Sequence, residues 1–256
     1  MKRLYAAFLL ILCFFILPGC QADGGKDTAR LGECVSPDAR AVSLILRRED
    51  CAVWTGTDAS EEGEERGIAF PGDRDLADIG KMTALEELVL DFDPEEQDQE
   101  LMRKLTEAFL ALPSLRSVVI SSAPYDPGAL QAAFPAETHL VNCSFETPAG
   151  LQNVQSLFLT DTVWDQGTFE GTEAVAALYL DGSSVPEKLE ELSAFPGLSR
   201  LTLPADAGSY SGEWPIGLSF EKAEIPDGVQ CRFSAEDLKA FLEERRDVAV
   251  LLRPVS

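Results

Sequence analysis

The chain has 256 residues, of which 45% are hydrophobic, and it carries 44 acidic against 21 basic side chains. Without Lys2 and Arg3, which belong to an expected signal, 19 basic residues remain and the net charge is near 19 − 44 = −25. A body this acidic is repelled by nucleic acid and by anionic lipid headgroups, so neither is expected to bind it directly. No Pro-, Gly- or Ser-rich stretch divides residues 34–256, and we expect them to form a single domain.

The first 19 residues have the features of an export signal. Two basic residues are followed by an apolar run from Leu4 to Leu17, which is shorter than the roughly 20 residues of a spanning helix. The sequence Leu17-Pro-Gly-Cys20 resembles the lipobox of bacterial lipoproteins, and the resemblance implies an acyl anchor such as palmitate on Cys20. A plain secretory signal or an uncleaved anchor are the alternatives. Residues 20–33 contain almost nothing apolar and are expected to be a flexible tether.

The first part of the body is expected to form strands at 41–46 and 51–54, within an N-terminal capping region (34–60). An acidic loop at 58–66 and a helical segment at 75–82 should follow. The clearest helix is predicted to begin at Asp93, a good cap, with Pro94 in its first position. Its apolar stripe, Leu101, Leu105 and Phe109, has helical spacing, and Pro113 ends it.

A short phrase with apolar residues at its first, fourth and sixth positions recurs along the chain. Clear copies are Leu85–Leu90, Leu115–Ile120, Val154–Leu159, Val175–Leu180 and Leu198–Leu203, and a weaker one is expected at 65–70. The gap of 39 residues between the starts at 115 and 154 can hold a further copy around 136–143, whose register the pattern does not determine. Short helical pieces are expected at 126–134 and 186–192. A period in the twenties with one strand per unit is typical of a stacked solenoid.

These phrases resemble leucine-rich repeats over residues 60–206. The resemblance implies an irregular α/β solenoid with a parallel sheet and short helices or turns on its convex side. The asparagine of the family's ninth position is replaced by Asp73, Asp93, Ala123, Thr162, Ser183 and Asp206, most of which can still bond backbone groups. Residues 207–256 are expected to cap the stack, with a strand at 229–233, a helix after Ser234 and a strand at 248–252. An α/β fold that is not a solenoid is the alternative.

No residue pattern indicates catalysis, a metal or a cofactor. His139 is the only histidine, and neither a nucleophile elbow nor zinc-ligand spacing occurs. Asp91 with Asp93, or Asp161 with Asp181, are the carboxylate pairs that a glycosidase would need, but 44 acidic residues produce such pairs by chance. The acidic run from Asp91 to 96 lacks the spacing of a calcium loop and is interpreted as a helix start.

The residues between the repeated leucines should face outward on the concave side of the sheet. Its central row is expected to contain Ala69, Val89, Val119, Phe158, Tyr179 and Thr202. Phe158 and Tyr179, flanked by Asp161 and Asp181, form the candidate binding surface, because outward aromatic residues with a polar rim are typical of recognition. The alternative is that the two rings cover one another or lie under a loop bearing Trp164.

Four cysteines remain once Cys13 leaves with the signal and Cys20 is acylated. Cys34 and Cys51 flank the first strand, and a disulfide between them is geometrically easy. Three or four strand steps of about 4.8 Å separate Cys143 from Cys231, more than the roughly 7 Å between Cα atoms that a disulfide tolerates. We therefore predict a Cys34–Cys51 bridge and two unpaired, mostly buried thiols.

The leading hypothesis is a non-catalytic lipoprotein, anchored to the cell membrane and facing outside the cytoplasm. Its repeat domain would bind a protein or a surface polymer such as a polysaccharide. An envelope hydrolase with a pair of carboxylates is the rival hypothesis. A solute-binding lipoprotein of a transporter is a third possibility, although such two-lobed proteins are longer than this chain.

Overall fold

The computed structural model describes residues 29–47, 50–56, 64–69, 71–95, 98–206, 218–220 and 230–254. The expected signal, Cys20 and most of the expected tether lie outside these residues. The fold is α/β, with a mostly parallel sheet and few, short helices, as the sequence predicts. The chain divides into two compact units, residues 1–116 and 117–256. None of the described helices has the length and apolar character that crossing a membrane requires.

The first unit contains strands β1 (Ala41–Arg47), β2 (Asp50–Gly56), β3 (Glu64–Gly67) and β4 (Glu87–Phe92). β1 runs parallel to β4 and antiparallel to β2, and β2 runs antiparallel to β3. The prediction of a repeat copy at 65–70 is therefore wrong. Only residues 57–63 connect β2 to β3, and a parallel crossover needs a dozen residues or more, so the chain turns back as a hairpin.

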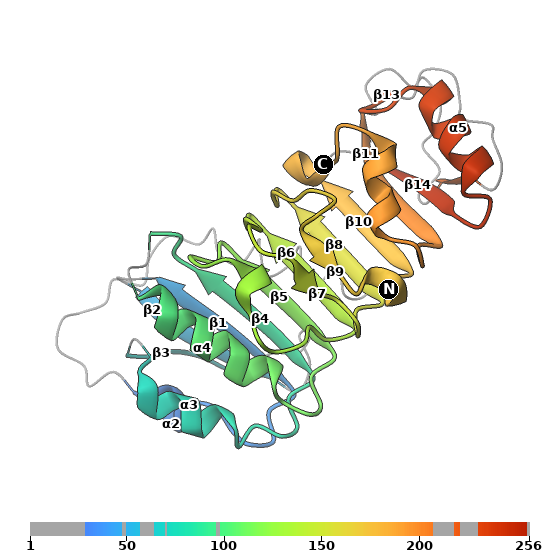
Figure 1. The fold of residues 1–256 in the computed structure, drawn as a ribbon. Helices are drawn as coiled ribbons and strands as arrows, with labels where there is room; N and C mark the ends of the chain where they lie inside the picture. Colours follow the sequence, from blue (N-terminus) through green and yellow to red (C-terminus); the bar gives the residue numbers. More distant parts are fainter. Residues whose placement is uncertain are drawn as a thin grey trace. The chain divides into compact units, whose positions relative to one another are not determined.

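Three helices belong to this unit, α2 (Leu31–Cys34), α3 (Asp73–Ile79) and α4 (Gln99–Leu110), and α3 packs against the other two (Figure 1). The prediction that α4 begins at Asp93 is wrong, because the carboxylate of Asp98 caps it by accepting the Leu101 amide at 3.1 Å. The carboxylate of Asp93 accepts the Glu95 amide instead and closes a local turn. Leu105 and Phe109 are fully buried, as the apolar stripe predicts, whereas Leu101 at its start is half-buried.

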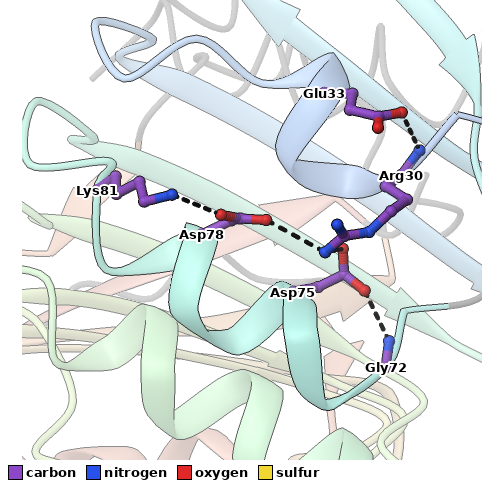
Figure 2. Close-up of polar contacts among 6 residues, drawn as sticks. All are labelled: Arg30, Glu33, Gly72, Asp75, Asp78 and Lys81. Carbon is purple, nitrogen blue, oxygen red and sulfur yellow. Dashed lines mark hydrogen bonds and ion pairs between the residues drawn. The ribbon is translucent and has the colours of Figure 1, made fainter.

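The end of the expected tether is folded. Ala29 pairs in parallel with Ile68, and Leu31 is completely buried. The guanidinium of Arg30 lies 3.6 Å from Asp75 and 3.4 Å from Asp78 (Figure 2). Residues 29–33 therefore belong to the body rather than to the tether.

The two cysteines of the predicted disulfide both lie in this unit. Cys34 ends α2 and Cys51 lies in β2, and both are half-buried thiols. The Cys51 thiol donates a hydrogen bond to the carbonyl oxygen of Arg47 at 3.2 Å. A bridge to Cys34 would have to form by oxidation of these thiols, and it stays a prediction.

Six strands of the second unit form one parallel array (Figure 1). In spatial order they are β5 (Ser117–Ser121), β6 (Glu137–Val141), β8 (Ser156–Thr160), β10 (Ala177–Asp181), β11 (Arg200–Asp206) and β14 (Ala249–Pro254). β12 (Leu218–Phe220) runs antiparallel to β14, and β13 (Gln230–Cys231) runs antiparallel to β11. Each of the phrases at 115, 154, 175 and 198 therefore ends in a strand of this array.

The register of the array aligns like positions of successive phrases. Leu140 pairs with Ile120 on one side and Leu159 on the other, and Leu159 pairs with Leu180. These four side chains are at most 3% exposed, so they form one buried face. The pairing gives the copy in β6 a start at 135, which divides the gap of 39 residues into 135 − 115 = 20 and 154 − 135 = 19.

The strands end in the same backbone conformation. The residues that follow β5, β6, β8 and β10 have positive φ: Ser122 (54°), Asn142 (51°), Asp161 (48°) and Gly182 (56°). The amides of the first three donate to the last carbonyl of the next strand, at 2.9, 2.9 and 3.2 Å. Glycine, asparagine and aspartate tolerate this left-handed conformation best, so the residue types fit the turn that the array repeats.

The side chains that directly follow two of these left-handed residues, Thr162 and Cys143, form hydrogen bonds with backbone carbonyls of the strands. The hydroxyl of Thr162, which is fully buried, donates to the carbonyls of Leu140 at 2.9 Å and Thr160 at 3.1 Å. The thiol of Cys143 makes the equivalent bonds one unit earlier, to Ile120 at 3.6 Å and Val141 at 3.3 Å. Thr162 is one of the residues expected to replace asparagine, and its hydroxyl bonds backbone carbonyls.

The connections of this unit hold its remaining elements. They are the parallel pair β7 (Ala149–Gly150) and β9 (Phe169–Glu170), helix α5 (Ala235–Glu244) and 3₁₀ turns at Pro127–Ala129, Thr172–Ala174, Gly182–Ser184 and Leu189–Ala194. The helical piece expected at 126–134 is only one turn long. Ser234 caps α5 by accepting the Asp237 amide at 3.1 Å, as predicted.

Candidate recognition surface

The outward face of the second unit carries the candidate binding residues. Along β5, β6 and β8 buried side chains alternate with half-buried ones, so the two sets point to opposite faces of the sheet. The half-buried set includes Val119, His139, Phe158 and Tyr179, which lie side by side in register on β5, β6, β8 and β10. This alignment agrees with the expected row and adds His139 to it.

Three of these side chains form a continuous stack, called the aromatic row below: His139, Phe158 and Tyr179. The ring centroids of His139 and Phe158 are 3.8 Å apart with an interplanar angle of 3°. Those of Phe158 and Tyr179 are 3.9 Å apart at 6°. Phe158 and Tyr179 therefore cover one another, which is one of the alternatives that the sequence left open. The stacked row presents ring edges outward, and these edges carry partial positive charge.

His139 joins the row through the register of β6. Its Nε2 lies 3.0 Å from a carboxylate oxygen of Glu137, the next outward residue on the same strand. The hydroxyl of Ser117 lies 3.5 Å from the same oxygen. Sequence reasoning missed this residue because its phrase keeps only Leu140 of the three apolar positions. The regular spacing of about 20 residues on either side was the signal that could have found it.

Asp161 and Asp181 lie at the carboxyl ends of the strands that carry Phe158 and Tyr179. Both are exposed, and each has one carboxylate oxygen bound to a backbone amide. Asp161 accepts from Ser183 at 3.0 Å, and Asp181 accepts from Gly182 at 2.8 Å. Their first role is therefore to hold the turns at the edge of the aromatic row.

Two other residues named from the sequence lie elsewhere. Thr202 pairs with Tyr179 and with Leu251 on the neighbouring strands, but it is only 3% exposed. Trp164 packs against Phe169 and Phe195, and its indole N–H donates to the carbonyl of Ser184 at 2.8 Å. The accessible row therefore ends at Tyr179 on this side.

The carboxylates considered for catalysis are bound to other groups. Asp91 forms an ion pair of 2.6 Å with Arg47, and Asp93 holds the turn before α4. Within the described ranges, no three His, Cys, Asp or Glu side chains gather closely enough to hold a metal ion. The contacts of Asp161 and Asp181 are likewise those of turn formation.

Cys143 lies in the second unit and is a buried thiol, as predicted. Burial raises the pKa of this thiol from its usual 9.0 to about 11. The side chain therefore stays protonated at neutral pH and is a poor nucleophile. Its role is structural, because the thiol forms hydrogen bonds with the carbonyls of Ile120 and Val141.

Comparison of the chain with models of protein families, with curated proteins and with solved structures gave no match.

Proposed function

We propose that this protein is a non-catalytic lipoprotein of the bacterial cell envelope, whose leucine-rich-repeat-like domain binds a protein or a surface polymer through the aromatic row. The observation that carries the proposal is the stack of His139, Phe158 and Tyr179 on the outward face of the parallel array. Aromatic residues on an open sheet face, with polar groups at the rim, are typical of recognition surfaces.

A repeat architecture of the leucine-rich type is supported by three features of the second unit. The phrases recur every 19 to 23 residues from 115 to 198 once the copy in β6 is counted, each unit contributes one strand, and four strands end in a left-handed residue. Thr162 and Cys143 occupy the ninth positions of two phrases and bond backbone carbonyls of the preceding strands. In a solenoid each unit contacts only its neighbours, which leaves the part of the outward face that carries the aromatic row for a partner.

Anchoring is proposed from the Leu17-Pro-Gly-Cys20 sequence alone. Replacing Cys20 by serine should move the exported protein from the membrane fraction to the soluble fraction, because the acyl chains are its only proposed attachment. Fractionation of cells that express each form provides the measurement. Retention of the exported serine variant in the membrane would contradict a lipid anchor at this position.

Recognition is tested by capture of envelope material on the immobilised full-length chain. Tyr179→Ala should reduce capture at least tenfold, since aromatic anchors contribute much of the energy of an interface. Val163→Ala is the matched control, because Val163 is a 60% exposed apolar residue outside the aromatic row. Undiminished capture by Tyr179→Ala, or equal losses for both variants, would contradict binding through the row. No observation among the described residues favours the rival hydrolase.

A further inference from the structure

The aromatic row is bordered by carboxylates at both ends of its strands. Glu137 precedes His139 by two residues on β6, and Asp181 follows Tyr179 by two residues on β10, so both belong to the outward set. Asp161 directly follows β8, at the same end as Asp181. The three strands that carry the row contain no lysine or arginine. The described part of this surface is therefore an apolar strip with acidic borders.

Each of these carboxylates uses one oxygen within the protein. In Glu137 this oxygen lies 3.0 Å from Nε2 of His139. In Asp161 and Asp181 it accepts a backbone amide of the neighbouring turn, at 3.0 and 2.8 Å. A carboxylate offers about four acceptor sites on its two oxygens, so each of the three can accept further donors from a partner.

The register of the strands gives the width of the strip. Glu137 pairs with Ser156, which pairs with Ala177 at the start of β10. Asp181 lies about 13 Å further along β10, and two strand steps of about 4.8 Å separate β10 from β6. The two borders are therefore roughly 16 Å apart, a distance that about five residues of extended chain span. Arg200 begins β11 and pairs with Ala177, so it lies about 14 Å from each border.

The stacking of the rings determines which chemical groups the row can bind. Phe158 has both ring faces covered, by His139 at 3.8 Å and by Tyr179 at 3.9 Å between ring centroids. The negative face of an aromatic ring attracts C–H groups such as those of a sugar, whereas the positive edge attracts oxygen atoms. The central ring therefore offers its edge to a carbonyl oxygen and cannot stack on a sugar.

We infer that the partner of the aromatic row is a polypeptide segment with lysine or arginine side chains, bound in an extended conformation across the row. The inference rests on the proposed function and specifies its partner. Backbone carbonyls of the segment meet the ring edges, and its basic side chains pair with Glu137 at one border and with Asp181 or Asp161 at the other. A neutral polysaccharide has no charge that matches these borders, and an anionic polymer is repelled by them.

Competition on the immobilised full-length chain tests the class of partner. The probes are octalysine, octaglutamate and chitotetraose, an uncharged oligomer of N-acetylglucosamine. Octalysine should displace captured envelope material, because it carries both the carbonyls and the positive charges that the surface matches. Octaglutamate and chitotetraose should displace none.

A pair of isosteric substitutions tests whether octalysine binds at the row. Glu137→Gln combined with Asp181→Asn keeps the acceptor oxygens of both side chains but removes two charges, and it should weaken octalysine binding about fivefold to tenfold. Glu243→Gln combined with Glu244→Gln is the matched control, because it removes two charges from exposed residues of α5, outside the strands of the row. The control should weaken binding less than about twofold. Melting temperatures equal to that of the unaltered chain establish that both variants fold.

The outcomes separate this inference from the proposed function. Displacement by chitotetraose would overturn the inference in favour of a polysaccharide, and displacement by octaglutamate would overturn it in favour of an anionic partner. Equal losses in the two double variants would mean that octalysine binds the overall charge of the protein rather than the row. Envelope material that octalysine leaves bound, while Tyr179→Ala still reduces capture, would overturn the inference and leave the recognition surface intact. Undiminished capture by Tyr179→Ala would instead refute the recognition surface, and with it the inference.

Discussion

Replacing Leu180 by alanine is expected to lower the free energy of unfolding by about 2–5 kcal/mol. Leu180 is 3% exposed, and it pairs in register with Leu159, which is fully buried. Truncation removes apolar contacts and leaves a cavity. The neighbouring strands close this cavity only in part, because their pairing with further strands of the array fixes their positions.

Chemical denaturation of the purified chain measures this loss. Val163→Ala removes carbon atoms from an apolar side chain that is 60% exposed, and it should change stability by no more than about 0.5 kcal/mol. A loss below about 1 kcal/mol for Leu180→Ala would mean that the leucine positions of the phrase do not form a packed core.

The turn at Gly197 is expected to be nearly as sensitive. A Cβ atom at this position would lie 2.1 Å from the carbonyl oxygen of Glu173, in the turn of the preceding unit. Backbone atoms of two stacked turns cannot separate without disturbing the strands that follow them. Gly197→Ala should therefore destabilise the chain by about 1–3 kcal/mol or more.

Gly80 provides the matched control for this substitution. It has an ordinary helical backbone (φ −58°), and the nearest atom to an added Cβ is 3.8 Å away. Gly80→Ala should be neutral or stabilise the chain by about 0.4–1 kcal/mol, because alanine restricts the unfolded chain. Similar melting temperatures for the two variants would show that the turns do not approach as closely as described.

The strands of the second unit were predictable because the leucines at alternate positions are the residues that face the core. An apolar residue at every second position marks the face of a sheet that packs inward, and Leu157 with Leu159 or Leu178 with Leu180 follow this pattern. The adjacency of Phe158 and Tyr179 followed from the same alignment. One register error of a single residue would have placed both rings in the core.

Three local features could not be predicted from the sequence: the start of α4, the hairpin of β2 and β3, and the folding of residues 29–33. Asp93 and Asp98 are both good caps, and the choice of Asp98 depends on which carboxylate reaches a third-position amide. The hairpin of β2 and β3 depends on the length of a connection rather than on apolar spacing. Residues 29–33 are held by the backbone pairing of Ala29, the burial of Leu31 and the ion pairs of Arg30, which the average composition of the segment does not show.

The candidate site was predictable only in part. His139 was recognised as the single histidine, but a strand with Pro135 and Thr138 at its expected apolar positions gave no register from which to place it. The face-to-face arrangement of the three rings is a property of side-chain torsions, on which residue spacing carries no information. The roles of Asp161 and Asp181 in turns follow from the left-handed backbone between the strands.

Unfolding of Tyr179→Ala measured beside Leu180→Ala tests most directly whether the aromatic row is a surface or part of the core. The two residues are neighbours on β10 and face opposite sides of the sheet. If the row is an outward surface available to a partner, Tyr179→Ala loses no more than about 1.5 kcal/mol, the contribution of an aromatic pair, while Leu180→Ala loses about 2–5 kcal/mol. Equal, large losses for both variants would place Tyr179 in the core and contradict a recognition surface on this face.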